Sequence, residues 1–322
     1  MNLSKKVFAS SLVACLLMAT SCIDPDSGNY AECSGKTYDS AVEFCYKGKI
    51  GKQCNDVERP RKLTHAVFLG NSLLLGNTNF GMNATSKEKD YFHYLDSAFR
   101  VANPDYKAMR LNAKEMENMT SLDSQMTELS REILPYLNEK TDLVSIQLGD
   151  NVKGKKEKLI FDKFVFNTYD AVCRAAPNAT VIWIGEWYSS DYKQKTIEYL
   201  SFKAGGIFVD ISDLNRPIYR SKISTVITYD HTIESSTPYS SYEVLGDTLE
   251  IYSGKNSQND GNIDAKIAVE SYKVDSAAKI IYWTGYQDIT FTDAVASHPN
   301  DRAFKLIADR VLQAIGPEFD GL

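Results

Sequence analysis

A serine and a histidine far apart in this chain are of the types that together cleave acyl bonds. Ser72 follows the apolar run of residues 66–69 and Gly70, so it stands where a buried strand is expected to end. His298 comes near the other end of the chain, just before a final amphipathic segment. A serine hydroxyl becomes an effective nucleophile when an imidazole takes its proton. If the fold brings the two side chains together, the chain can act as a serine hydrolase.

The elements that would position these residues alternate along residues 63–213. Strands are expected at residues 65–69, 106–111, 142–148, 180–185 and 206–210. Helical patterns lie between them, the first predicted to begin at the capping-box sequence Thr85-x-x-Glu88 and to run to Arg100. Apolar strands alternating with helices are typical of a parallel sheet covered on both faces. We therefore predict an α/β fold, a three-layer α/β/α sandwich with a parallel five-stranded sheet, closed by a helix over residues 301–315.

The alternation breaks between residues 216 and 289. Short β-rich runs, separated by polar turns, replace it at residues 223–228, 248–252, 265–272 and 279–283. We expect a β-rich insertion or lid ahead of the histidine, so that the sandwich consists of residues 63–215 plus 290–322.

The N-terminus has the features of an export signal. Lys5 and Lys6 precede an apolar core over residues 7–18, and small residues lead to Cys22. This core is too short to span a bilayer, and the cysteine after small residues resembles a bacterial lipobox. We expect residues 1–21 to be a lipoprotein signal peptide, Cys22 to be lipidated, and residues 22–62 to form a tether. The protein would then be anchored in the bacterial cell envelope, at the outer membrane or cell surface. The alternative is ordinary cleavage, with Cys22 left as a free or paired thiol.

The other cysteines suit an exported protein. Cys33, Cys45 and Cys54 lie in one polar stretch, and we expect one disulfide there, with Cys33–Cys45 favoured and Cys54 left over. Cys173 lies in an apolar helical pattern and is expected to be a buried, inert thiol. The spacings lack a CxxC pair, which argues against zinc.

Composition excludes other classes of function. The net charge is −6 and no basic cluster is present, which argues against nucleic acid as a partner. No metal-ligand cluster and no G-x-G-x-x-G after a strand are found, so neither a metal nor an organic cofactor is predicted.

Three separated segments resemble the conserved blocks of the SGNH (GDSL-type) hydrolase superfamily. Gly70-Asn71-Ser72-Leu73 resembles the first block, with Asn71 where Asp is common, and Gly149-Asp150-Asn151 resembles the Gly-x-Asn block. His298-Pro299-Asn300-Asp301 resembles the histidine block that opens the last helix. The order of the blocks covers residues 63–213 and 290–320, and the resemblance implies an SGNH or flavodoxin-like fold.

The resemblance also implies residue roles. Ser72 would be the nucleophile and His298 its base, while the Asn151 amide and the Ser72 backbone N–H would stabilise the oxyanion. The family places Asp three residues before the histidine, where this chain has Val295. Either Asp293 orients the imidazole, if the loop bulges, or a backbone carbonyl does so.

A third oxyanion donor, normally a glycine N–H after the second strand, has no glycine here at residues 111–113. A neighbouring backbone amide would replace it, or the donor would be absent. Trp187, after the fourth strand, is placed at the substrate pocket, with ordinary packing as the alternative.

We expect an extracytoplasmic serine esterase acting on an ester substrate, with an acetyl group on a polysaccharide as the expected target. Secretion and family analogy are the basis for this substrate class. The alternatives are an O-acyltransferase, which uses the same acyl-enzyme, and a catalytically degenerate domain that binds a glycan or another partner at the cell surface.

Overall fold

A parallel five-stranded sheet forms the centre of the computed structural model, which describes residues 30–40, 43–54, 60–76, 80–228, 233–252 and 265–322. Its strands lie in the order β6-β5-β7-β8-β9. They are β5 (His65–Gly70), β6 (Lys107–Asn112), β7 (Leu143–Gln147), β8 (Thr180–Ile184) and β9 (Ile207–Val209). The predicted five-stranded parallel sheet is confirmed. The chain leaves β5 toward β6 and returns on the other side to β7, so residues after these strands meet at a point where the strand order reverses.

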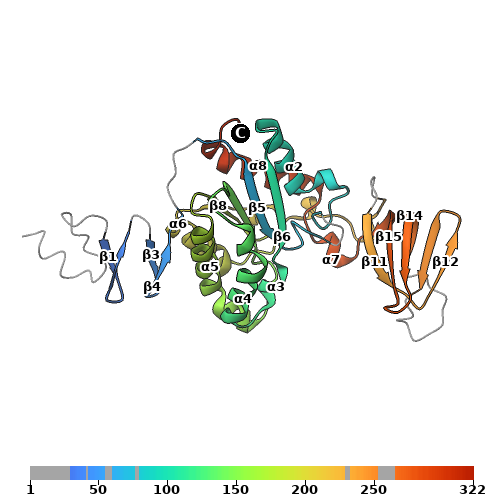
Figure 1. The fold of residues 1–322 in the computed structure, drawn as a ribbon, viewed down its shortest axis with the longest axis horizontal. Helices are drawn as coiled ribbons and strands as arrows, with labels where there is room; N and C mark the ends of the chain where they lie inside the picture. Colours follow the sequence, from blue (N-terminus) through green and yellow to red (C-terminus); the bar gives the residue numbers. More distant parts are fainter. Residues whose placement is uncertain (1–29, 41–42, 55–59, 77–79, 229–232, 253–264) are drawn as a thin grey trace, which may run out of the picture.

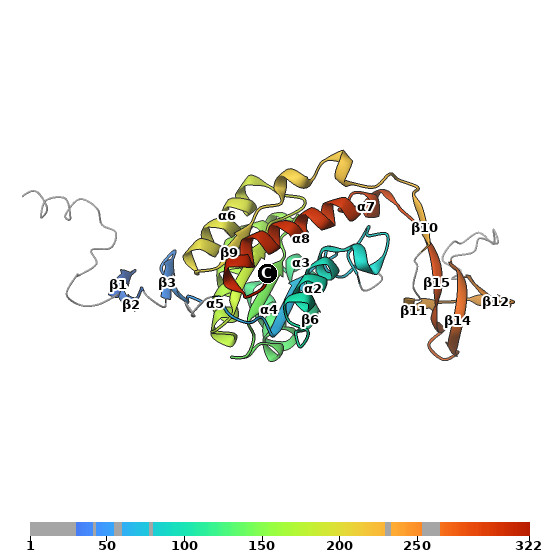
Figure 2. The same ribbon diagram turned by 90° about the horizontal axis from the view of Figure 1, so that it is seen from above.

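Helices cover both faces of this sheet (Figure 2). One face carries α2 (Tyr91–Ala102) and α8 (Asp301–Ile315), and the other carries α4 (Leu122–Glu132), α5 (Lys155–Ala175) and α6 (Asp191–Lys203). The side chains of β8 alternate between two cores: Ile182 and Ile184 pack with the α2 and α8 side, whereas Val181 and Trp183 pack with the α4 to α6 side. Burial on both faces explains why this strand reads as a continuous apolar run.

The short helices connect these layers. They are α3 (Lys114–Asn118), α7 (Asp293–Ala296) and the 3-10 turns η1 (Lys87–Lys89), η2 (Leu134–Tyr136), η3 (Ser212–Leu214), η4 (Pro217–Tyr219) and η5 (Gly316–Glu318). The predicted capping box at Thr85 is wrong: α2 begins at Tyr91, and Asp90 accepts the N-cap hydrogen bond from the His93 N–H. Thr85 instead binds Asp301 through its backbone N–H and its hydroxyl, at 2.8 and 2.6 Å.

A six-stranded antiparallel sheet is inserted between the fifth parallel strand and the histidine. It extends from the sandwich at the end of the molecule opposite the N-terminal hairpins (Figure 1). Its strands are β10 (Val226–Thr228), β11 (Ile233–Pro238), β12 (Ser241–Leu245), β13 (Thr248–Tyr252), β14 (Ala265–Asp275) and β15 (Ile280–Thr290). The two connections to the sandwich pair with each other, because Ser224 N–H donates to the Phe291 carbonyl and Phe291 N–H to the Thr225 carbonyl, both at 2.8 Å.

Two β-hairpins precede the sandwich. The first joins β1 (Tyr30–Cys33) to β2 (Lys36–Asp39), and the second joins β3 (Glu43–Tyr46) to β4 (Lys49–Lys52). The second hairpin packs on α5, where the rings of Phe44 and Phe166 meet edge to face with centroids 5.2 Å apart. Part of the segment expected to be a tether is therefore folded onto the sandwich.

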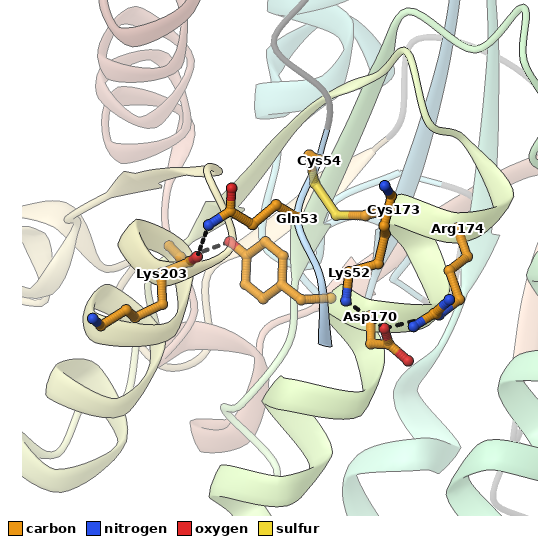
Figure 3. Close-up of a disulfide and its surroundings, with 9 residues drawn as sticks. Lys52, Gln53, Cys54, Asp170, Cys173, Arg174 and Lys203 are labelled. Carbon is orange, nitrogen blue, oxygen red and sulfur yellow. Dashed lines mark hydrogen bonds and ion pairs between the residues drawn. A yellow bond between two sulfur atoms is a disulfide. The ribbon is translucent and has the colours of Figure 1, made fainter. Parts of the chain in front are cut away.

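The disulfides differ in part from the expectation. Cys33 and Cys45 are paired, as predicted, but Cys54 is not left over and Cys173 is not a free thiol, since these two also form a disulfide. Figure 3 shows the bond between α5 and the chain after β4, beside the Asp170 carboxylate that accepts the Lys52 N–H at 2.6 Å. Cys173 is fully buried, as predicted, in the core on this face of the sheet. The sequence analysis did not predict this pairing because the two cysteines are 119 residues apart in the chain.

Within the described residues, no helix is both long and apolar enough to cross a membrane. The predicted signal peptide and the predicted lipidation site at Cys22 lie outside the described residues.

Candidate active site

Ser72 lies in the turn that follows β5. The Asn71 carbonyl accepts hydrogen bonds from the N–H groups of Leu74 and Leu75, at 3.0 and 2.9 Å, which turns the chain sharply after the strand. Asn71 is buried and its Oδ1 accepts the Leu73 N–H at 3.1 Å, which fixes the direction of its amide. Ser72 itself is partly exposed. The turn therefore presents the hydroxyl at the carboxyl edge of the sheet, where ligands bind in open α/β folds.

The structure brings His298 to this serine. The Oγ of Ser72 lies 2.9 Å from the Nε2 of His298, although the two residues are 226 positions apart. The histidine is held between α7 and α8: its N–H donates to the Val295 carbonyl at 3.0 Å, and its carbonyl accepts from the Asn83 side chain at 2.6 Å. This distance is within hydrogen-bond reach, as proton transfer between nucleophile and base requires.

The second ring nitrogen of His298 is held by the backbone. Its Nδ1 lies 2.7 Å from the Ala294 carbonyl oxygen, which assigns the proton to Nδ1. The lone pair of Nε2 is then directed at the Ser72 hydroxyl. Burial lowers the pKa of the imidazole from its ordinary value of 6.5. At neutral pH the histidine is therefore uncharged and able to accept a proton.

Asp293 does not take the orienting role. Asp293 is the first residue of α7 and is exposed to solvent. Both residues lie in the described part of the chain, and no hydrogen bond joins the Asp293 carboxylate to His298. The reason is helical geometry: the turn of α7 carries the carbonyl of Ala294, four residues before the histidine, onto Nδ1. Of the two arrangements that the sequence left open, the structure has the backbone carbonyl.

Trp187 is not a pocket-lining residue. Its side chain is fully buried, and its indole N–H donates to the Ser297 carbonyl at 2.8 Å. It supports the loop that carries the histidine rather than contacting solvent. The neighbouring Tyr188, which the sequence analysis did not single out, is half-buried and packs edge-on against the imidazole, with ring centroids 5.7 Å apart. Its hydroxyl lies 2.7 Å from the Ser297 hydroxyl and 3.3 Å from Nδ1 of His298.

Asn151 follows β7 and is partly exposed. Its Nδ2 donates to Oε2 of Glu117 at 2.7 Å, and its backbone N–H donates to Oε1 of the same residue at 3.2 Å. A side-chain amide nitrogen carries two hydrogens. We find no acceptor for the second among the described residues, so it remains for a bound oxygen.

The turn before Asn151 requires a glycine. Gly149 has φ +133°, and a Cβ there would lie 2.7 Å from a carboxylate oxygen of Glu186. Glu186 is buried and forms an ion pair with Lys193, whose ammonium also donates to the Gly149 carbonyl at 2.8 Å. Burial raises the pKa of Glu186, and the charge of Lys193 opposes that rise.

The backbone N–H expected as a third oxyanion donor, after the second strand, is used in a hydrogen bond within the sheet. After β6 the Ala113 N–H donates to the Gly70 carbonyl at 2.9 Å, so this amide extends the pairing of β5 with β6. It is not directed at the site, so of the three donors considered from the sequence, the Ser72 N–H and the Asn151 amide remain.

Sequence analysis missed Glu117, Tyr188, Lys193 and Asn83. Tyr188 follows a predicted strand end by a few residues, and that position is a signal that could have found it. Glu117 lies in the polar run Lys114-Glu115-Met116-Glu117-Asn118, where nothing distinguishes a buried carboxylate from a solvated one. Among the residues that the structure describes, no group of three or more His, Cys, Asp or Glu side chains could hold a metal ion.

Comparison with known proteins gives partial structural likenesses. No protein-family model matches the chain, and no curated protein matches it. The chain is similar to an extracellular lipase from Streptomyces rimosus, at 16% identity and a TM-score of 0.34, covering 47% of this chain and 81% of that one. It is also similar to a phospholipase A1 from Streptomyces albidoflavus, at 14% identity and a TM-score of 0.35, covering 50% and 88%.

A third likeness is to an acetyl xylan esterase from the rumen bacterium Butyrivibrio proteoclasticus, at 13% identity and a TM-score of 0.32, covering 51% of this chain and 58% of that one. Scores at this level describe a partial likeness and carry no argument about function.

Proposed function

We propose that this protein is an SGNH-type serine esterase whose acyl-enzyme forms on Ser72. The observation that carries the proposal is the pair of contacts on one imidazole: Nε2 lies 2.9 Å from the Ser72 hydroxyl while Nδ1 lies 2.7 Å from the Ala294 carbonyl. One ring nitrogen is thereby assigned as donor and the other as acceptor, which is the arrangement that general-base activation of a serine requires.

The reaction would proceed in two halves. The Ser72 oxygen attacks the ester carbonyl as its proton moves to Nε2 of His298, and the imidazolium then gives that proton to the departing alcohol. Water repeats the sequence: it loses a proton to Nε2, attacks the acyl group and releases the acid and the serine hydroxyl. A buried imidazole favours the neutral form, so the base is ready at the start of each half.

The oxyanion would be stabilised by Asn151 and the Ser72 N–H. Removing one such side-chain donor typically lowers kcat by about 100- to 1000-fold. With the Ala113 N–H used in the sheet, the site depends on two donors rather than three.

We place the protein in the bacterial cell envelope, held by a lipid on Cys22, and propose an acetyl group on a polysaccharide as its substrate. The two disulfides support an oxidising compartment, because such bonds persist outside the reducing cytosol. The basic and apolar residues before Cys22 support export.

The test is hydrolysis of p-nitrophenyl acetate by the protein beginning after Cys22, compared with Ser72→Ala and His298→Ala. We expect each substitution to abolish turnover above the background rate, with the folded state confirmed by circular dichroism. Ser72→Ala is also expected to abolish labelling by a fluorophosphonate.

Wild-type hydrolysis that survives Ser72→Ala would exclude this mechanism. Labelling of Ser72 without hydrolysis would instead favour acyl transfer to a sugar hydroxyl, and absence of both would favour a surface-binding protein. An acetylated-polysaccharide screen follows only if the serine-dependent activity is found.

A further inference from the structure

Glu117 connects the two loops that supply the proposed nucleophile and oxyanion donor. It is fully buried at the end of α3, the short helix after β6. Its Oε1 accepts from the Gly149 N–H at 2.5 Å, from the Asn151 N–H at 3.2 Å and from the Asn71 side chain at 3.2 Å. Its Oε2 accepts from the Asn151 side chain at 2.7 Å. One carboxylate thus joins the turn before Ser72 to the turn that ends at Asn151.

All four groups around this carboxylate are hydrogen-bond donors. Two are backbone N–H groups, and the Asn71 amide is fixed in direction because its Oδ1 already accepts the Leu73 N–H. An ionised carboxylate can accept all four bonds, whereas a carboxylic acid or a carboxamide must place a hydrogen against at least one donor. These four donors, the hydrogen-bonding shell of Glu117, therefore favour the ionised form of its carboxyl group.

The Asn151 amide is the member of this shell that is free to respond. With Oε2 unprotonated, the amide must turn its nitrogen toward Glu117, and the second hydrogen of that nitrogen is available for a bound oxygen. If Oε2 carried a hydrogen, the amide would turn its oxygen toward it to avoid two opposed donors, and the oxyanion donor would be lost.

We propose that ionised Glu117 is the positioning residue that holds the Asn151 amide in its oxyanion-donating direction. This inference rests on the proposed esterase function, and it assigns Glu117 an effect on the transition state that it exerts through Asn151.

The charges near Glu117 give this role a pH dependence. Burial, and then the negative charge of Asp150, raise the pKa of Glu117 to about 7 from its ordinary 4.5. Asp150 itself accepts from Gln147, from the Tyr188 N–H and, at 3.5 Å, from Asn71. The Glu186–Lys193 ion pair lies on the other side of Gly149, and on α4 the uncharged Gln125 binds the Met116 carbonyl.

The raised pKa of Glu117 determines on which side of neutral pH activity is lost. Above about pH 7 Glu117 is ionised and Asn151 donates, while below it the carboxyl gains a proton and the donor turns away. The pKa of His298 is lowered below 6.5, so loss of the base occurs at a lower pH than protonation of Glu117. We therefore expect kcat/KM of the wild type, which reports ionisations of the free enzyme, to fall as the pH decreases through about 7.

The test is Glu117→Gln, assayed with p-nitrophenyl acetate between pH 5 and 9. The carboxamide imitates the protonated acid at every pH, so we expect kcat at pH 8 to fall about 10- to 100-fold, with KM changed less than about threefold. The acid limb near pH 7 should vanish and leave a limb below pH 6.5. An unchanged kcat together with an unchanged acid limb overturns the proposal.

Asp162→Asn is the matched control. Asp162 is also a buried carboxylate, on α5, where it accepts from Lys47 and Tyr46 at 2.5 and 3.2 Å. We expect this variant to keep the wild-type kcat and acid limb even if it loses stability. A similar loss of kcat in both variants would indicate a general effect of removing a buried charge and would overturn the proposal.

A second variant keeps the test decisive if Glu117→Gln does not fold. Asn151→Ala retains Glu117 but has no amide to turn, so its residual activity should lack the limb near pH 7. A limb of unchanged size in this variant contradicts the proposal. Loss of serine-dependent hydrolysis in the wild type itself would remove the esterase function and this inference together, whereas normal wild-type activity with an unaffected Glu117→Gln removes only the inference.

Discussion

The imidazole of His298 is oriented by a peptide carbonyl instead of a carboxylate. The Ala294 oxygen fixes the tautomer as well as an aspartate would, since both accept the Nδ1 hydrogen. It differs in charge: a carbonyl dipole stabilises an imidazolium less than a full negative charge at the same distance. In the proposed reaction, this carbonyl would keep the Nδ1 proton in place but contribute less electrostatic stabilisation to the transition state.

This arrangement predicts that Asp293→Asn is nearly silent. We expect kcat for p-nitrophenyl acetate to change less than about threefold, because the carboxylate has no contact with the ring, whereas loss of the aspartate in a true triad costs about 10 000-fold. Steady-state kinetics beside Ser72→Ala measure this. A loss of more than 100-fold would show that Asp293 acts in the reaction after all.

The residues of the candidate site lie just after the ends of strands and helices, so these elements determine where the residues meet. Ser72, Glu117 and Asn151 follow three adjacent parallel strands, so the alignment of β6, β5 and β7 sets which loops can meet. His298 comes from another element pair: α7 ends just before it, and α8 begins just after it at its N-cap Asn300. The Asn300 side chain also donates to the carbonyls of Ile218 and Arg220, at 3.2 and 3.1 Å. The start of α8 is therefore fastened on two sides.

Asn300→Ala should loosen this start. We expect the free energy of unfolding to fall by about 1–2 kcal/mol, because the Ala303 N–H loses its cap and two carbonyls lose their donor. The measurement is chemical denaturation followed by circular dichroism. Asn300→Ser is the matched control: its hydroxyl keeps a cap acceptor and sets no carboxylate against the two carbonyls, so its loss should be smaller, and an equal loss in both variants would contradict the capping explanation.

At the scale of the whole molecule, the Cys54–Cys173 disulfide fastens the chain after the second N-terminal hairpin to one end of the sandwich. This bond ties the chain after the docked hairpin to the last turn of α5, and the Cys54 N–H also donates to the Ala204 carbonyl at the end of α6, at 3.0 Å. The inserted six-stranded sheet extends from the other end of the sandwich, beside the histidine loop (Figure 1). The sandwich that carries the site is therefore cross-linked at one end and bears the inserted sheet at the other.

Replacing both Cys54 and Cys173 by Ala should lower the free energy of unfolding by about 3–5 kcal/mol, because the bond closes a loop of more than one hundred residues. Replacing Cys33 and Cys45, which are only 12 residues apart, should cost less. Guanidinium denaturation of the two double variants compares them. An equal loss, or a larger one for the shorter loop, would contradict the loop-length argument.

The sequence by itself determined the parallel sheet and the β-rich insertion, because apolar period and strand-end position are local signals. It gave the meeting of Ser72 with His298 only as an expectation that depended on the fold. Only the tertiary structure decided the rest. The docking of the second hairpin on α5 brought Cys54 to Cys173, and the turn of α7 placed the Ala294 carbonyl, rather than the Asp293 carboxylate, on the imidazole. Glu117 and Trp187 were misjudged or missed because burial depends on neighbours remote in the chain. A residue type states what a side chain can do, and packing determines whether it meets solvent, a partner or a proton.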